Sequence, residues 1–293
     1  MTFLAMQTEE MSDITGALVW WELQGCVRQE DLAEALELQG LPASWAPGAP
    51  RMETVAQRAA SSLVQHKRQM LRPLGGRGNY DFVTEEVREV VENGRASPKL
   101  AYYANVRVLV VGDGEEKSIA VEPSTAADME LARNIASAVH HFTGLLTATD
   151  VSTWLLWVLD RHVDAVSLRQ RGGFYFVPVG EPLNTWRRVA RCLTTCSSHI
   201  CSSMSAVRSE DAVQAILRAV REEADVKLAA LEEYLDGDVS TRGINAWGRD
   251  MATLQAKTTR YATLLGLELP EITNRATILL GALSAAKLVA TTD

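Results

Sequence analysis

Four residues with metal-ligating side chains lie close together in the chain: Cys192, Cys196, His199 and Cys201. Three thiolates and one imidazole are a donor set that can hold a tetrahedral zinc ion. The C-x3-C-x2-H-x-C spacing matches no zinc ribbon or finger, because no paired Cys-x2-Cys clusters bracket a loop. Free cysteine often packs as a small apolar residue. We therefore predict reduced thiols with no metal or other cofactor, and the zinc site is the alternative.

Two segments carry an excess of positive charge in a chain whose formal net charge is −8. Residues 51–77 hold six basic residues and one acid, and residues 161–191 hold six and two. In the second segment, arginines precede the aromatic run Phe174–Phe176, and charge with stacking can bind a nucleic-acid strand. Surface charge clusters are often only solvated or paired. Nucleic-acid binding is therefore the alternative function, and its candidate residues are Arg58, Lys67, Arg68, Arg72, Arg169, Arg171, Arg187 and Arg188.

Common catalytic motifs are absent from the sequence. The passage Gly75–Gly78 lacks the Lys-Ser/Thr pair of a phosphate-binding loop, and there is no Gly-x-Ser-x-Gly nucleophile elbow. His140 and His141 are not part of a His-Glu-x-x-His motif, which binds zinc in metalloproteases. We therefore expect a non-enzymatic protein.

The last third of the chain has the pattern of paired helices. Its apolar residues from Ile244 to Leu265 recur at alternating spacings of three and four, which is a heptad seam. The preceding stripe in Ser209–Asp236 and the break at Gly237 predict an antiparallel helical hairpin, and Pro270 opens a last helix. The seam can pack inside the hairpin or against a second chain. The predicted interface residues are Ile244, Trp247, Met251, Leu254 and Tyr261.

Alternating side chains predict strands in the middle of the chain. Over Leu100–Val111 the even-numbered residues from Tyr102 to Val110 would share one face. Gly112–Gly114 then predicts a turn into a second strand at Lys117–Val121, and a third strand is expected at Gly173–Val177. These three strands would form one small sheet that needs helices to cover it.

Helical patterns surround these strands. A basic helix is expected at residues 51–70, a further helix at about 125–143, and another from after the capping residues Thr149-Asp150 to about Leu168. We predict an α+β protein, predominantly α-helical, with a small antiparallel three-stranded sheet and a C-terminal antiparallel helical hairpin. Three consecutive regions are expected: an N-terminal helical region with the basic helix (1–95), a central α+β region (96–182), and the helical hairpin with a final helix (183–293).

The sequence also indicates a location. The N-terminal residues MTFLAMQTEE lack a basic region and a long apolar run, so we expect no secretory signal. The C-terminal apolar segment Ala276–Ala290 is shorter than the ~20 residues that cross a bilayer. Four cysteines with Cys26 far from the others suit a reducing compartment. We therefore expect a cytoplasmic protein that does not associate with a membrane.

Two short motifs resemble an uncharacterised family of actinobacterial and actinobacteriophage proteins. The segment Arg171–Pro178 resembles its Arg/Ser-Gly-Gly-x-Tyr-Phe-Val-Pro motif, and Leu41-Pro42 with Pro50-Arg51 is similar to its N-terminal pattern. Here Val55–Gln57 stands where similar proteins often read Ala-Phe-Arg. The resemblance implies a phage or actinobacterial setting and no mechanism. Our leading hypothesis is an interaction protein that associates with itself or with a host or phage protein through its C-terminal helices.

Overall fold

The computed structural model describes residues 14–65, 67–92, 95–169, 172–237 and 239–290. These residues form two compact units. Of the described residues, unit 1 combines those in 14–25, 35–45 and 151–290, and unit 2 combines those in 26–34 and 46–150. The units therefore interleave along the chain, whereas the sequence patterns predicted three consecutive regions. Helices α1 (Gln29–Leu38) and α4 (Ala148–Arg161) each contribute residues to both units.

Unit 1 contains a four-stranded antiparallel sheet in the order β10-β1-β9-β8. Strand β1 lies between β9 and β10, and its Leu18 is opposite both Phe176 and Met204. Because side chains alternate along a strand, these three residues share one face of the sheet. The strands are β1 (Ile14–Glu22), β8 (Val166–Ser167), β9 (Tyr175–Pro178) and β10 (Ile200–Val207).

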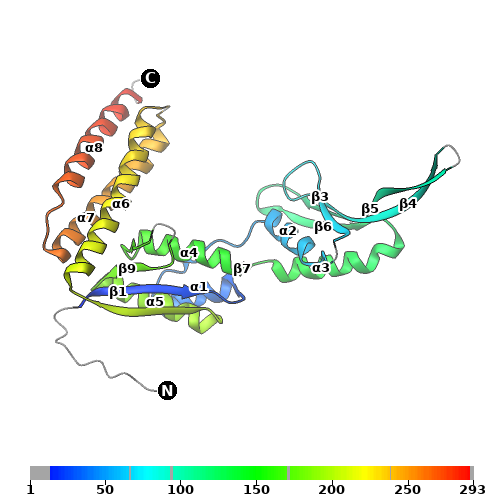
Figure 1. Ribbon diagram of the computed structural model, residues 1–293, viewed down its shortest axis with the longest axis horizontal. Coiled ribbons are helices and arrows are strands. Elements are labelled where there is room, and N and C mark those ends of the chain that lie inside the picture. The colour runs from blue at the N-terminus through cyan, green and yellow to red at the C-terminus, as the bar shows by residue number, and fades with distance from the viewer. Residues whose placement is uncertain (1–13, 66, 93–94, 170–171, 238, 291–293) are drawn as a thin grey trace, which may run out of the picture. The chain divides into compact units, whose positions relative to one another are not determined.

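Helices pack on both faces of this sheet. On one face lies α5 (Glu181–Cys196), whose Trp186 ring is 6.2 Å from that of Trp21. On the other face, three C-terminal helices pack side by side (Figure 1) and share a core with Phe176 and Val166. The predicted helical hairpin with a final helix is thus confirmed. Its helices are α6 (Glu210–Leu235), α7 (Thr241–Leu265) and α8 (Pro270–Ala290).

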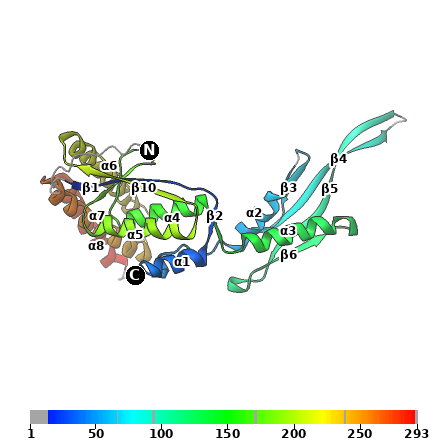
Figure 2. The ribbon, with the colours of Figure 1, turned by 90° about the horizontal axis from the view of Figure 1, so that it is seen from below.

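Unit 2 contains a second four-stranded antiparallel sheet, in the order β3-β4-β5-β6. Helices α2 (Met52–Ser62) and α3 (Met129–Phe142) lie against one face of it (Figure 2), around the buried Phe82 and Val106. The strands are β3 (Gln69–Pro73), β4 (Tyr80–Glu92), β5 (Arg95–Val111) and β6 (Ser118–Pro123). A separate pair consists of β2 (Cys26–Arg28) and β7 (Leu145–Thr147), and 3-10 turns occur at Ala43–Trp45, Gly114–Glu116 and Ala126–Asp128.

The α+β class is confirmed, but the single three-stranded sheet is wrong. The predicted hairpin exists as β5 and β6, with Arg107 opposite Glu122. The third predicted strand exists as β9, but it pairs with β1 and β8 in unit 1. The hairpin pairs instead with β4, in a region that the sequence patterns assigned to helices. Long-range strand pairing depends on residues far apart in the chain, so local periodicity does not reveal it.

The predicted basic helix is also too long. It ends at Ser62, and residues 69–73 form the edge strand β3. Four alanine and valine residues of α2 are buried, namely Val55, Ala56, Ala59 and Ala60. After Ser62 the residues are mostly polar, so no apolar stripe continues to hold a helix against the sheet.

A β-bulge changes the predicted faces of β5. Phe82 pairs with Val106 but Val83 pairs with Ala104, so Asn105 is the extra residue. As a result Tyr103 and Asn105 both reach Asp128, beside α3, on the helix-covered face where Val106 is buried. The prediction of one continuous face of even-numbered residues is therefore wrong at the bulge.

The carboxylate of Asp128 joins this bulge to the start of α3. It accepts hydrogen bonds from Tyr103 Oη (3.0 Å), Asn105 Nδ2 (2.9 Å) and the Thr125 amide and hydroxyl (3.1 and 2.7 Å). Burial opposes ionisation of this carboxyl, but the bonds from Asn105, Thr125 and Tyr103 outweigh burial and lower its pKa. Asp128 therefore stabilises unit 2 as a charged, fully hydrogen-bonded group.

We expect Asp128→Ala to lower the free energy of unfolding by about 1–3 kcal/mol, because the half-buried donors on Tyr103 and Asn105 lose their acceptor. Because folding lowers the pKa of Asp128, its contribution is complete above the ordinary value of 3.8 and is lost as pH falls through the lower folded value. Urea unfolding at neutral pH measures the loss, and Asp113→Ala, an exposed acid in the same unit, is the control. Equal stability of the two variants would contradict this role.

Candidate functional site

One face of the unit 1 sheet is only partly covered by the protein's own helices. Four large apolar residues share this face, and we call them the open-face patch: Trp20, Phe174, Ile200 and Met204. Phe174, Ile200 and Met204 are 46%, 47% and 56% exposed. The ring of Trp20 lies 5.6 Å from that of Phe174. Exposed apolar residues that are contiguous in this way commonly mark a binding surface.

The register of β1 explains why these residues lie together. Ser202 is opposite Trp20, and Met204 is opposite Leu18. Residues two apart on a strand point the same way, so Ile200, Met204 and Trp20 share the face of Leu18. Among the described residues, the core of α6–α8 includes Leu18 and Phe176 but none of the four patch residues. The patch is thus the part of this face that the C-terminal helices leave uncovered.

The opposite face is partly covered by α5. Trp21, next to Trp20 in the chain, stacks on Tyr175 with ring centroids 5.2 Å apart and lies beside Trp186 of α5. Cys201 is opposite Trp21, and burial raises the pKa of its thiol to about 12. The two adjacent tryptophans therefore have different neighbours: Trp21 packs with Tyr175 and Trp186 on the α5 side, whereas Trp20 lies beside Phe174 in the open-face patch.

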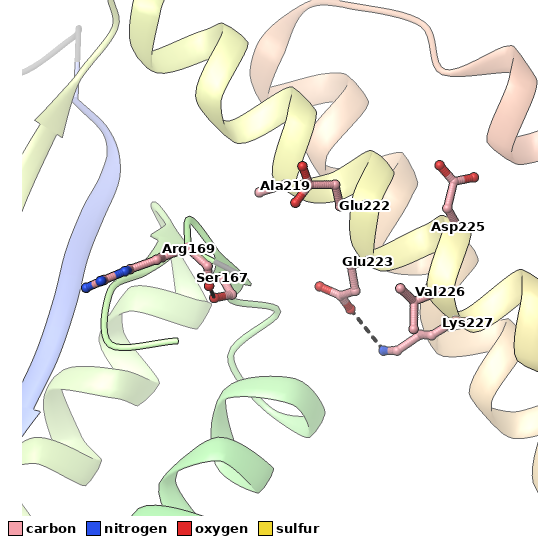
Figure 3. A pocket seen from close by; sticks show the side chains of 8 residues that line it. All are labelled: Ser167, Arg169, Ala219, Glu222, Glu223, Asp225, Val226 and Lys227. Atoms are coloured by element: carbon pink, nitrogen blue, oxygen red, sulfur yellow. Dashed lines mark hydrogen bonds and ion pairs between the residues drawn. The ribbon is translucent and has the colours of Figure 1, made fainter. Parts of the chain in front are cut away.

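A groove of about 620 Å³ lies on the same side of the sheet, between α6 and the end of β8 (Figure 3). Arg169 and Ser167 contribute one wall, and α6 contributes the other with mostly charged residues. The exposed side chain of Val226 is its one large apolar wall residue. The α6 residues are Ala219, Glu222, Glu223, Asp225, Val226 and Lys227.

The acids of this groove are largely occupied within the chain. Glu223 accepts bonds from the ammonium groups of Lys257 (2.7 Å) and Lys227 (2.9 Å). Lys257 is almost fully buried and also donates to the Ala165 carbonyl at 2.6 Å. Burial lowers the pKa of Lys257, which the charge of Glu223 opposes. These bonds connect α6 and α7 to the backbone just before β8. The role of Glu223, Lys227 and Lys257 is therefore structural rather than catalytic.

The structure places the residues of the alternative zinc site, Cys192, Cys196, His199 and Cys201, at the end of α5 and the start of β10. Among residues 14–290 that the structure describes, no three His, Cys, Asp or Glu side chains are grouped to hold an ion. Cys192 is buried, its Sγ lies 3.2 Å from the Ala35 carbonyl, and burial raises its pKa to about 11. His199 accepts a bond from the Gln24 amide on Nδ1 at 3.1 Å. That bond requires a neutral ring, and burial lowers the pKa of His199.

Residues of the first basic segment have several roles in unit 2. Arg58 pairs with Asp150 at 2.8 Å and is mostly buried, so it stabilises the fold. Lys67 and Arg68 are exposed just before β3. A row of alternating charges crosses the sheet through one residue of each strand: Arg72, Asp81, Arg107 and Glu122. Arg72 therefore stands beside an acid, which reduces the charge it offers to a phosphate.

The second basic segment lies in unit 1, so the two segments belong to different units. Arg188 donates to the carbonyls of Gln39 and Gly40, which is a structural role. Arg187 on α5 is exposed, and Arg169 lines the groove. Arg171 lies outside the described residues.

The predicted interface residues are mostly buried within their own chain. Ile244, Met251, Leu254 and Tyr261 are at most 3% exposed in the core of α6–α8. Trp247 is partly buried, and its ring lies 6.1 Å from that of Tyr234. The heptad seam left two alternatives open, packing within the hairpin or against a second chain. Packing within the chain accounts for the burial of these side chains. The sequence analysis did not predict the open-face patch. The run of apolar residues around Trp20 is the sequence feature that could have indicated it.

The sequence profile of one protein family matches residues 14–290. The chain belongs to DUF6744, a family of unknown function. The DUF6744 match begins at the first residue of β1 and ends at the last residue of α8, so it includes both units. No curated protein and no solved structure matches the chain. In the described part of this DUF6744 chain, no helix combines the length and apolarity needed to span a membrane.

The neutral state of His199 predicts a loss of stability in acid. Because burial lowers its pKa below 6.5, the unfolded chain takes up a proton at a pH where the folded chain does not. Stability is therefore complete above pH 6.5 and falls as pH decreases through the folded value. In His199→Asn, whose Oδ1 can accept the Gln24 amide, this fall should be smaller, while the exposed His140→Asn control should match the wild type. Urea unfolding from pH 7.5 to 5 measures it, and an identical slope in all three proteins would contradict the assignment.

Proposed function

We propose that this DUF6744 protein is a non-enzymatic interaction protein that binds another polypeptide at the open-face patch. The observation that carries this proposal is the exposure of Phe174, Ile200 and Met204, together with the half-buried Trp20, on one face of the sheet. Aromatic residues and methionine are enriched in the centres of protein interfaces. Burial of such side chains by a partner removes their apolar surface from water, which favours association.

The charges around the patch favour a protein over a nucleic acid. Strand β10 has no charged residue, and Glu22 is opposite Ile200 at the end of the patch. The nearby α6 wall contributes the further acids Glu222 and Asp225. A phosphate backbone is bound mainly through lysine and arginine, so an apolar surface with acidic neighbours suits it poorly.

The proposal keeps the interaction function expected from the sequence but assigns it to another surface. The seam of α7 is used inside the chain, and its burial holds the C-terminal helices over Phe176. From the resemblance to actinobacterial and phage proteins, we further propose that the partner is a host or phage protein or a second copy of the chain.

We expect Phe174→Ser with Met204→Ser to abolish capture of the partner by the tagged protein from its producing cells. Both side chains are about half exposed, so the free energy of unfolding should change by no more than about 0.5 kcal/mol. Ile278→Lys, an exposed apolar position on α8, is the matched control and should retain capture.

Oxidative footprinting of the purified complex adds a direct readout. Met204 should be oxidised in the free monomeric protein and protected in the complex. Equal oxidation of Met204 in both states, or loss of capture by the Ile278→Lys control, would contradict binding at the patch.

Nucleic-acid binding remains the second candidate, and the exposed position of Lys67 and Arg68 beside the edge strand β3 favours it. This hypothesis predicts oligonucleotide binding that weakens steeply with salt, and a log–log salt slope that decreases by about one per phosphate contact removed. Arg68→Ala with Arg72→Ala should reduce the slope, whereas Arg133→Ala on the exposed side of α3 should not. Absence of binding at low salt would eliminate this candidate.

A further inference from the structure

Strand β10 is an edge of the unit 1 sheet. Over its eight residues it pairs with β1 on one side, and no described strand pairs with its other side. Every second residue of such an edge directs its backbone N–H and C=O groups outward. An unpaired edge of this length is a template for pairing with a further strand.

The two edges of the unit 2 sheet differ from β10 in composition. Edge strand β3 contains Arg72 and Pro73, and edge strand β6 contains Glu122 and Pro123. Charged residues and proline are the usual devices that prevent edge pairing. Strand β10, Ile-Cys-Ser-Ser-Met-Ser-Ala-Val, has neither. Within one molecule, the edges of one sheet are thus protected and this edge is not.

We propose that β10 pairs antiparallel with β10 of a second copy of the chain and forms one continuous eight-stranded sheet. The inference rests on the proposed function, since it names the polypeptide that adjoins the open-face patch. A strand that pairs with itself places like residues near one another, and β10 can do so without charge repulsion because it is uncharged. The edge of β10 can therefore pair with the same edge of a second copy of the chain.

Symmetry links this pairing to the patch. A two-fold axis that relates antiparallel strands of one sheet is perpendicular to the sheet, so the same face of both copies lies on the same side. Ile200 and Met204 lie on β10 itself, and both are about half exposed. In the dimer, the Ile200 and Met204 side chains of the two copies adjoin across the axis. Pairing at the edge therefore also buries part of the open-face patch.

Ser203→Lys with Ser205→Lys tests the edge without changing any patch residue. Both serines are exposed on β10, and lysine at an edge is the natural device against pairing. Sedimentation equilibrium should give the full-length wild type twice the chain mass of 32.1 kDa. The double-lysine variant should dimerise at least about tenfold more weakly, because four like charges meet at the axis. The Ile278→Lys control should dimerise as the wild type does.

Three results would overturn the inference. A wild type that stays a monomer up to about 100 µM, well above a micromolar dissociation constant, would exclude the dimer. A dimer unaffected by the two lysines would exclude pairing through β10. A monomer that dimerises only after removal of residues 1–13 would assign the edge to that segment. Each of these leaves the proposed function open, since that depends on partner capture and on protection of Met204 by a different polypeptide.

Discussion

Covering the apolar faces of the unit 1 sheet removes them from water, and the protein's own helices do this on part of each face. Phe176 and Val166 are fully buried because α6, α7 and α8 pack on them. This packing buries the heptad seam of α7. The residues that the sequence predicted as an interface with another chain therefore pack inside this chain. This core does not include the open-face patch, in which Phe174, Ile200 and Met204 are about half exposed.

Buried charge holds this arrangement in place. Lys257 reaches from α7 to Glu223 of α6 and to the backbone at Ala165, just before β8. An ammonium group this deeply buried is tolerated only with several hydrogen-bond acceptors, and three are present. Tyr261 adds a bond to the Asp164 carbonyl in the same region. The C-terminal helices are therefore attached to the sheet by directional bonds as well as by apolar packing.

Unit 2 has its own sheet and core, and it uses polar residues differently. Its bulge at Asn105 directs two polar side chains to Asp128, which couples β5 to the start of α3. On the other face of the sheet, Arg107 pairs with Asp81 at 3.0 Å within a row of alternating charges. Both arrangements satisfy charges locally. The DUF6744 match includes both units.

Local patterns in the sequence predicted helices and a hairpin, whose contacts are between residues close together in the chain. The heptad spacing from Ile244 to Leu265 defined α7, and the alternation before Val111 with the glycines that follow defined the β5–β6 hairpin. Only the tertiary structure decided which strands pair: β9 joins β1 across more than 150 residues of chain, and β4 occupies a region with no strand prediction. Strand partners and exposed faces depend on contacts between distant residues, and no local period encodes them. For the same reason the sequence does not say which of the neighbouring residues Trp20 and Trp21 lies on the α5 side of the sheet.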